Sequence, residues 1–82
     1  MSIGGIDASG IGSFAHGYAS YGGINAKGYG AHAEGYAMNG TIDASGNGAH
    51  AEGYATKALA EGAHAEGRYS TASGYSSHAE GY

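Results

Sequence analysis

The chain has 82 residues and a formal net charge of -4, and it contains 18 glycines but no Pro, Cys or Trp. Because Ala and Gly dominate and large aliphatic residues are scarce, an ordinary hydrophobic core is excluded for this one small domain. The mild acidity argues against a nucleic acid partner. The lack of any long apolar run argues against membrane insertion, and the lack of Cys excludes disulfides and thiolate metal sites.

A unit built on Ala-His-Ala-Glu-Gly recurs along the chain. Its copies begin at Gly12, Gly30, Gly48, Gly62 and Ser76, so the intervals are 18, 18, 14 and 14 residues, and residues 1–11 form the second half of one more unit. Self-similarity at a fixed period is typical of a solenoid, in which one small unit is stacked on copies of itself. We therefore expect residues 1–82 to form a single repeat domain that is a segment of a longer fibre.

Small and polar residues alternate within the unit, which predicts a short strand with Ala on one face and His and Glu on the other. The second half of each unit predicts another short strand, and the frequent Gly residues argue against helices. Two strands and two Gly-marked bends per 14-residue coil indicate a thin solenoid. Its interior is expected to hold Ala33, Ala51, Ala65 and Ala79, with the two sheets closer than the usual spacing of roughly 10 Å.

The two longer coils carry four extra residues each, Tyr21–Ile24 and Asn39–Ile42. We expect these segments to lengthen one bend and to project from the stack. They are interpreted either as tolerated loop extensions or as an external ridge, with Ile6, Ile24 and Ile42 in equivalent positions.

The pattern small-x-Ala-x-Gly, with x-Ala-x-Gly half a unit later, resembles the head domain of trimeric autotransporter adhesins over nearly the whole chain. It is also similar to the Ser-His-Ala-Glu-Gly repeats of phage tail-fibre and appendage proteins and of bacterial surface proteins. The resemblance implies an all-β fold, a left-handed parallel β-roll, in which three chains associate around a common axis. It further implies an extracellular or virion location, a role in adhesion or fibre formation, and a cell-surface or glycan receptor as partner.

Adhesin heads hold Val and Ile at the two x positions, where the side chains point at the trimer axis. The matching positions here hold a column of Phe and His and a second column of His and Glu. The resemblance therefore implies a polar trimer interface, formed by Phe14, His16, His32, Glu34, His50, Glu52, His64, Glu66, His78 and Glu80.

Three interpretations of these columns stay open. The first is a closed hydrogen-bond network between chains, in which a carboxylate orients each imidazole. The second is a metal site for Zn or Ni made by symmetry-related copies of His32, His50, His64 or His78, the sequence otherwise implying no cofactor. The third is a solvent-facing glycan site with Tyr18, Tyr36, Tyr54 and Tyr82 stacking nearby.

Catalysis is not expected from this chain. The same Ser, His and Glu residues return in every coil, which is the opposite of a unique constellation with one nucleophile and one base. The sequence thus predicts a non-enzymatic structural protein with no catalytic residues.

Overall fold

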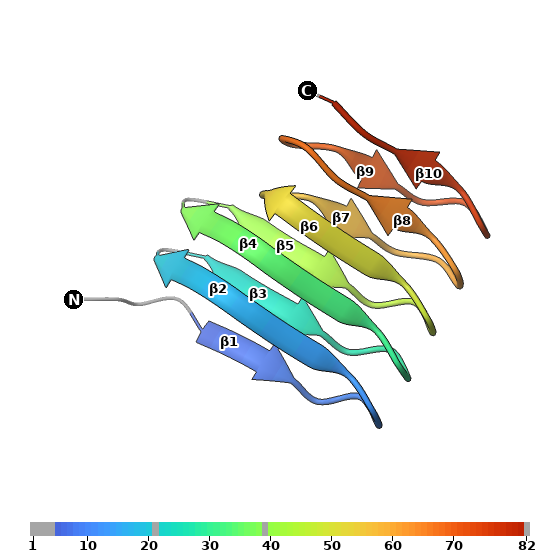
Figure 1. Cartoon of the computed structure of the whole chain (residues 1–82), viewed down its shortest axis with the longest axis horizontal. Helices are drawn as coiled ribbons and strands as arrows, with labels where there is room; N and C mark the ends of the chain where they lie inside the picture. Colours follow the sequence, from blue (N-terminus) through green and yellow to red (C-terminus); the bar gives the residue numbers. More distant parts are fainter. Residues whose placement is uncertain (1–4, 21, 39, 82) are drawn as a thin grey trace.

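The computed structural model of the chain describes residues 5–20, 22–38 and 40–81, which form two five-stranded parallel sheets (Figure 1). The odd sheet is ordered β1 (Gly5–Ala8), β3 (Gly23–Ala26), β5 (Thr41–Ala44), β7 (Lys57–Ala58) and β9 (Thr71–Ala72). The even sheet is ordered β2 (Phe14–Ser20), β4 (His32–Met38), β6 (His50–Tyr54), β8 (His64–Ala65) and β10 (His78–Ala79).

The chain alternates between the two sheets, so that each pair of consecutive strands makes one coil of a β-solenoid. Figure 1 shows the even sheet lying over the odd sheet along the whole stack. This confirms the predicted all-β solenoid class. No described residue belongs to a helix, and none of the described segments is a helix that could cross a membrane.

Neighbouring coils pair in the register that the repeat predicts. Phe14 lies opposite His32 and His16 lies opposite Glu34. His50 follows His32, and His64 and His78 continue the same column through β8 and β10. The main chain thereby brings every copy of the repeated unit onto its predecessor, and equivalent side chains form straight columns.

The interior is narrow and is filled by small side chains. Ala33, Ala51 and Ala65 are fully buried as predicted, and Ala79 in the last coil is partly buried. Across both sheets the molecule is only 13 Å thick. Methyl groups suffice to fill this space, and a larger side chain at these positions would force the sheets apart.

The prediction for the inserted segments was wrong. The structure places Ile24 in β3 and Ile42 in β5, and both side chains are fully buried; Ile6, in the first coil, is about half exposed. The extra residues lengthen the strands instead of a projecting loop, because an apolar side chain gains more from burial between the sheets than from exposure at an edge. Tyr21 and Asn39, which belong to the two segments, lie outside the described residues.

Two glycine columns set the geometry of each coil. Gly30 stands in the tight bend that the backbone of Ala31 closes by donating to the carbonyl of Gly28, and its φ of 65° is the left-handed conformation that such a turn requires. Gly35 has a φ of 132°, and a Cβ there would overlap the main chain of Gly53 in the next coil. The close stacking of the coils therefore depends on the missing side chain at the second position.

Candidate functional site

The outer face of the even sheet carries the repeated polar and aromatic side chains. Along β4 the residues Ala33 and Ala37 are buried, whereas the alternating residues His32, Glu34 and Tyr36 face outward. This is the alternation expected of a strand with one buried face. We call the three outward columns the His column, the Glu column and the Tyr column.

All ten residues predicted for the trimer interface belong to the first two of these columns. The His column holds Phe14, His32, His50, His64 and His78, and the Glu column holds His16, Glu34, Glu52, Glu66 and Glu80. The structure thus brings the predicted residues together on one face. Their assignment to an interface between chains stays a prediction.

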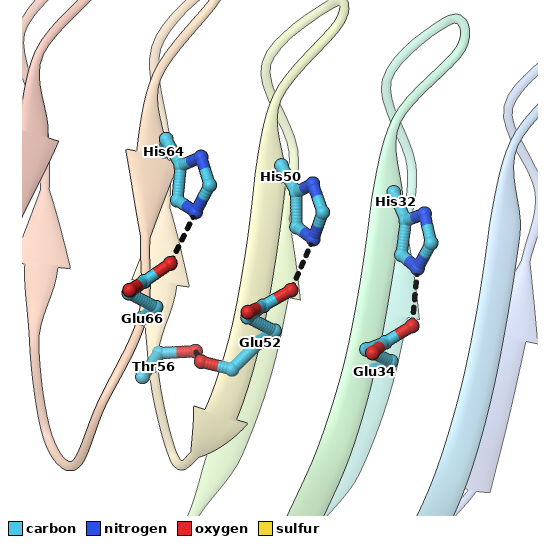
Figure 2. Close-up of polar contacts among 7 residues, drawn as sticks. All are labelled: His32, Glu34, His50, Glu52, Thr56, His64 and Glu66. Atoms are coloured by element: carbon cyan, nitrogen blue, oxygen red, sulfur yellow. Dashed lines mark hydrogen bonds and ion pairs between the residues drawn. The ribbon is translucent and has the colours of Figure 1, made fainter. Parts of the chain in front are cut away.

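Each imidazole in the His column is held by the carboxylate two residues further along the chain. The Nε2 to Oε1 distances are 2.5 Å for His32 with Glu34, 2.7 Å for His50 with Glu52, 2.9 Å for His64 with Glu66, and 2.8 Å for His78 with Glu80. Figure 2 shows three of these pairs side by side with the same orientation. The expected orientation of imidazole by carboxylate is therefore already present within a single chain.

The imidazoles also stack on one another along the column. Ring centroids of His32 and His50 lie 4.4 Å apart, and those of the next two neighbouring pairs lie 4.7 Å apart, with interplanar angles of 6° to 10°. Phe14 ends the stack by meeting His32 edge to face at 4.7 Å. The strand spacing of about 4.8 Å imposes this distance on any side chain that repeats in register.

The Tyr column continues the stacked pattern beside the Glu column. Tyr18 stacks on Tyr36 at 5.0 Å and Tyr36 on Tyr54 at 5.2 Å. Arg68 takes the next position and places its guanidinium 5.0 Å from the ring centre of Tyr54, a cation–π arrangement. The sequence prediction missed Arg68, although its place after the repeated Glu-Gly marked it as a member of this column; Tyr82 lies outside the described residues.

The side chains of the His and Glu columns are partly exposed to solvent. The side chains of His50 and Glu52 are 33% and 36% exposed, and those of the other middle pairs are similar. The pKa of Glu34 is lowered, first because its carboxylate accepts the hydrogen bond from His32 and further by the positive charge that neighbouring imidazoles take on, while desolvation opposes the shift. A partly shielded carboxylate in this setting stays ionised in acid better than a free one does.

Two groups of side chains have the composition of a metal site. One is His50, Glu52 and His64, and the other is His64, Glu66 and His78; within each group the ligand atoms lie within 4.8 Å of one another. Each group spans two neighbouring strands of one chain. His32, the remaining residue of the predicted metal column, belongs to neither group.

No pocket opens among the residues that the structure describes. No family model matches the sequence, and neither a curated protein nor a solved structure matches it. The functional interpretation therefore depends on the repeating face itself.

Proposed function

We propose that the chain is a structural segment of a fibre or adhesin on a bacterial or virion surface. Three copies, each a left-handed β-roll, would pack around a common axis through the outer faces of their even sheets. The segment would serve as a stiff spacer or as a head that contacts a receptor, and it would have no catalytic activity. The observation that carries this proposal is the in-register stacking of the His, Glu and Tyr columns on one face of the even sheet.

The thin interior supports association with other copies. Apart from Ile24 and Ile42, the described core is made of Ala, so each coil buries little apolar surface. Ordering a residue costs about 1.5 kcal/mol, and small cores of this kind seldom offset that cost alone. Packing a whole sheet face against neighbouring chains would supply the missing burial.

The composition of the even face suits contact with protein. Phe14, Tyr18 and Tyr36 are 49%, 54% and 39% exposed, and the same face carries Arg68, whose guanidinium lies over Tyr54. Aromatic residues and Arg are enriched at protein interfaces.

The His–Glu pairs supply hydrogen-bonding groups for such an interface. The pairs described above use Nε2 of each imidazole and Oε1 of each carboxylate. The remaining Nδ1 and Oε2 atoms along the same face accept hydrogen bonds while Nε2 carries the ring proton, so a neighbouring chain would pair them with its donors. Because polar groups buried between chains must be paired, the register between chains would be set by these columns.

The outer face of the odd sheet would then be the surface available to a receptor. It carries Asp7, Asn25, Asp43, Lys57 and Thr71, of which Asp7, Lys57 and Thr71 are exposed. This mixture of acidic, neutral polar and basic side chains suits a cell-surface or glycan receptor better than a nucleic acid. The repetition of one side-chain set in every coil also argues against a catalytic constellation.

The mass in solution tests the proposal directly. Light scattering coupled to gel filtration should give about three times the chain mass of 8.1 kDa over a wide range of protein concentration. A mass equal to a single chain would contradict the proposal.

A pair of charge variants then tests which face is used. Tyr36→Lys on the even face should dissociate the assembly, because the added ammonium would be buried between chains. Asn25→Lys, on the outer face of the odd sheet in the same part of the stack, should leave the mass unchanged. The double variant His50→Val with Glu52→Ile should keep or strengthen assembly, as the resemblance to adhesin heads implies.

A further inference from the structure

We infer that one chain by itself binds a divalent transition-metal ion on the even sheet, through His64 together with either His50 and Glu52 or Glu66 and His78. All three ligands of each group come from a single chain, so the site does not require the proposed assembly, in which packing through the even faces would compete with the ion for these side chains. It differs from a site on a symmetry axis, to which three chains would each contribute one imidazole.

The register of the sheet creates both groups. His50 and His64 are direct partners across β6 and β8, and His64 and His78 are direct partners across β8 and β10. The carboxylates of Glu52 and Glu66 reach back to Nε2 of the imidazole two residues earlier in the chain. An imidazole–carboxylate pair therefore meets a second imidazole from the adjacent coil.

The ligand atoms are close enough to converge if the side chains rotate. Tetrahedral zinc with bonds of about 2.0–2.1 Å separates its nitrogen ligands by about 3.4 Å. The ligand atoms of each group lie within 4.8 Å, so closure requires a shift of up to about 1.4 Å. In the single chain the side chains of His50, His64 and their carboxylate partners Glu52 and Glu66 are about one-third exposed, which leaves room for them to rotate.

The rings must also turn out of their stack to bind. The imidazoles of His50 and His64 lie 10° from parallel, whereas a metal ion has to lie near the plane of every ring that binds it. Binding through Nε2 further requires the ring proton to sit on Nδ1, since a nitrogen that carries a proton has no lone pair to offer. The ion would thus replace the stacking and the Nε2–Oε1 hydrogen bond with three coordinate bonds.

The donor set selects the kind of ion. Two imidazoles and one carboxylate suit Zn²⁺, Co²⁺, Ni²⁺ and Cu²⁺, whereas Ca²⁺ and Mg²⁺ prefer oxygen ligands. The two groups share His64, and one lone pair serves one ion. The expected stoichiometry is therefore one ion per chain, in contrast to one ion per three chains at a symmetry axis.

Metal titration of the untagged chain tests the inference. After treatment with EDTA, the chain is titrated with ZnCl2 by calorimetry, and with CoCl2 while the visible absorption of the cobalt is followed. We expect one ion per chain, a higher melting temperature with Zn²⁺, and no binding of Mg²⁺. Absence of stoichiometric Zn²⁺ binding, or one ion per three chains, would overturn the inference.

His64→Gln is the decisive variant because it removes the ligand that both groups share. It should weaken Zn²⁺ binding by at least about tenfold, the lower limit for losing a group that only orients a metal ligand. His32→Gln is the matched control, since His32 also stacks on a neighbouring imidazole and has its own carboxylate partner, Glu34, but lies outside both groups. Equal weakening in the two variants would contradict the assignment.

A second variant tests the site in case His64→Gln fails to fold. The double substitution Glu52→Gln with Glu66→Gln leaves every imidazole in place and removes the carboxylate from both groups. It should also weaken Zn²⁺ binding by at least about tenfold, and unchanged binding would show that the carboxylates are not ligands.

Discussion

The longer coils and the shorter coils of this solenoid keep the same sheets and the same columns, but they close the turn after the even strand differently. In the longer coils β4 runs to Met38, and β5 buries Ile42 under the sheet. In the shorter coils the chain reverses directly after Tyr54, through Ala55 with a φ of 54°. The equivalent of Ile42 is then Thr56, which is fully buried and donates its hydroxyl to the carbonyl of Glu52 at 3.0 Å (Figure 2).

This difference shows how a four-residue change in coil length alters the core of a solenoid. Extra residues extend both strands and create a strip of interior wide enough for Ile. Without the extra residues the strands and the interior between them are shorter, and the hydroxyl of Thr56 donates to the main-chain carbonyl of Glu52 at the tight turn. The His and Glu columns pass through the transition without a break in register.

The largest effect is expected from the glycine column that both kinds of coil share. Gly35→Ala should abolish cooperative folding, because the new Cβ would overlap the main chain of Gly53 and the φ of 132° is unfavourable for any side chain. Circular dichroism and thermal melting measure the result. Gly30→Ala is the control, since a Cβ there meets no atom within 4 Å and should cost only about 1–2 kcal/mol for its positive φ.

The next largest effects should separate the two kinds of coil. Ile42→Ala is expected to lower the free energy of unfolding by about 2–5 kcal/mol, through the cavity that it leaves in the longer coil. Thr56→Val keeps the side-chain shape but leaves the Glu52 carbonyl without its hydroxyl donor, at a cost of about 1–3 kcal/mol. Urea denaturation at one protein concentration measures both. A gain in stability from Thr56→Val would show that apolar burial governs the shorter turn as well.

A smaller, stabilising effect is expected in the last coil. Ser76 has a φ of 55° at a position where the preceding coils hold glycine. Ser76→Gly should raise stability by up to about 1 kcal/mol by relieving this conformation, the gain being limited by the entropy of glycine in the unfolded chain. Amide hydrogen exchange around β10 should slow in this variant. The reverse change, Gly48→Ser at the equivalent position of an earlier coil, should lower stability, and a gain in stability there would contradict the explanation.

The smallest effect concerns the dependence of stability on pH. The pKa of Glu34 is lowered in the folded chain from its usual value of 4.5, chiefly by the hydrogen bond from His32. The stabilisation is therefore complete above the unfolded pKa and is lost as the pH falls through the folded pKa. Melting temperatures of the native chain and of Glu34→Gln should differ at pH 6 and converge in stronger acid. A constant difference across this range would mean that ionisation of Glu34 contributes nothing.

Much of the molecule could be predicted from the repeat, including the two parallel sheets, the buried Ala33 and Ala51, and the column that joins His32 to His50. These features follow from alternation and spacing, which are local properties of the chain. The burial of Ile24 and Ile42 could not be predicted in this way. An inserted segment reads equally well as a loop or as a strand extension until the facing sheet is in place to cover it.

The sequence by itself determined the coil length, the register and the side chains that share a column, because one residue of slip would exchange the Ala and His faces. Only the tertiary structure decided the distances between equivalent side chains of neighbouring coils and which of their atoms come together. Stacking at the strand spacing brings the ligand atom of His64 within 4.8 Å of those of the His50–Glu52 pair in the preceding coil. That proximity is set by main-chain hydrogen bonds between coils, which no single repeat unit contains.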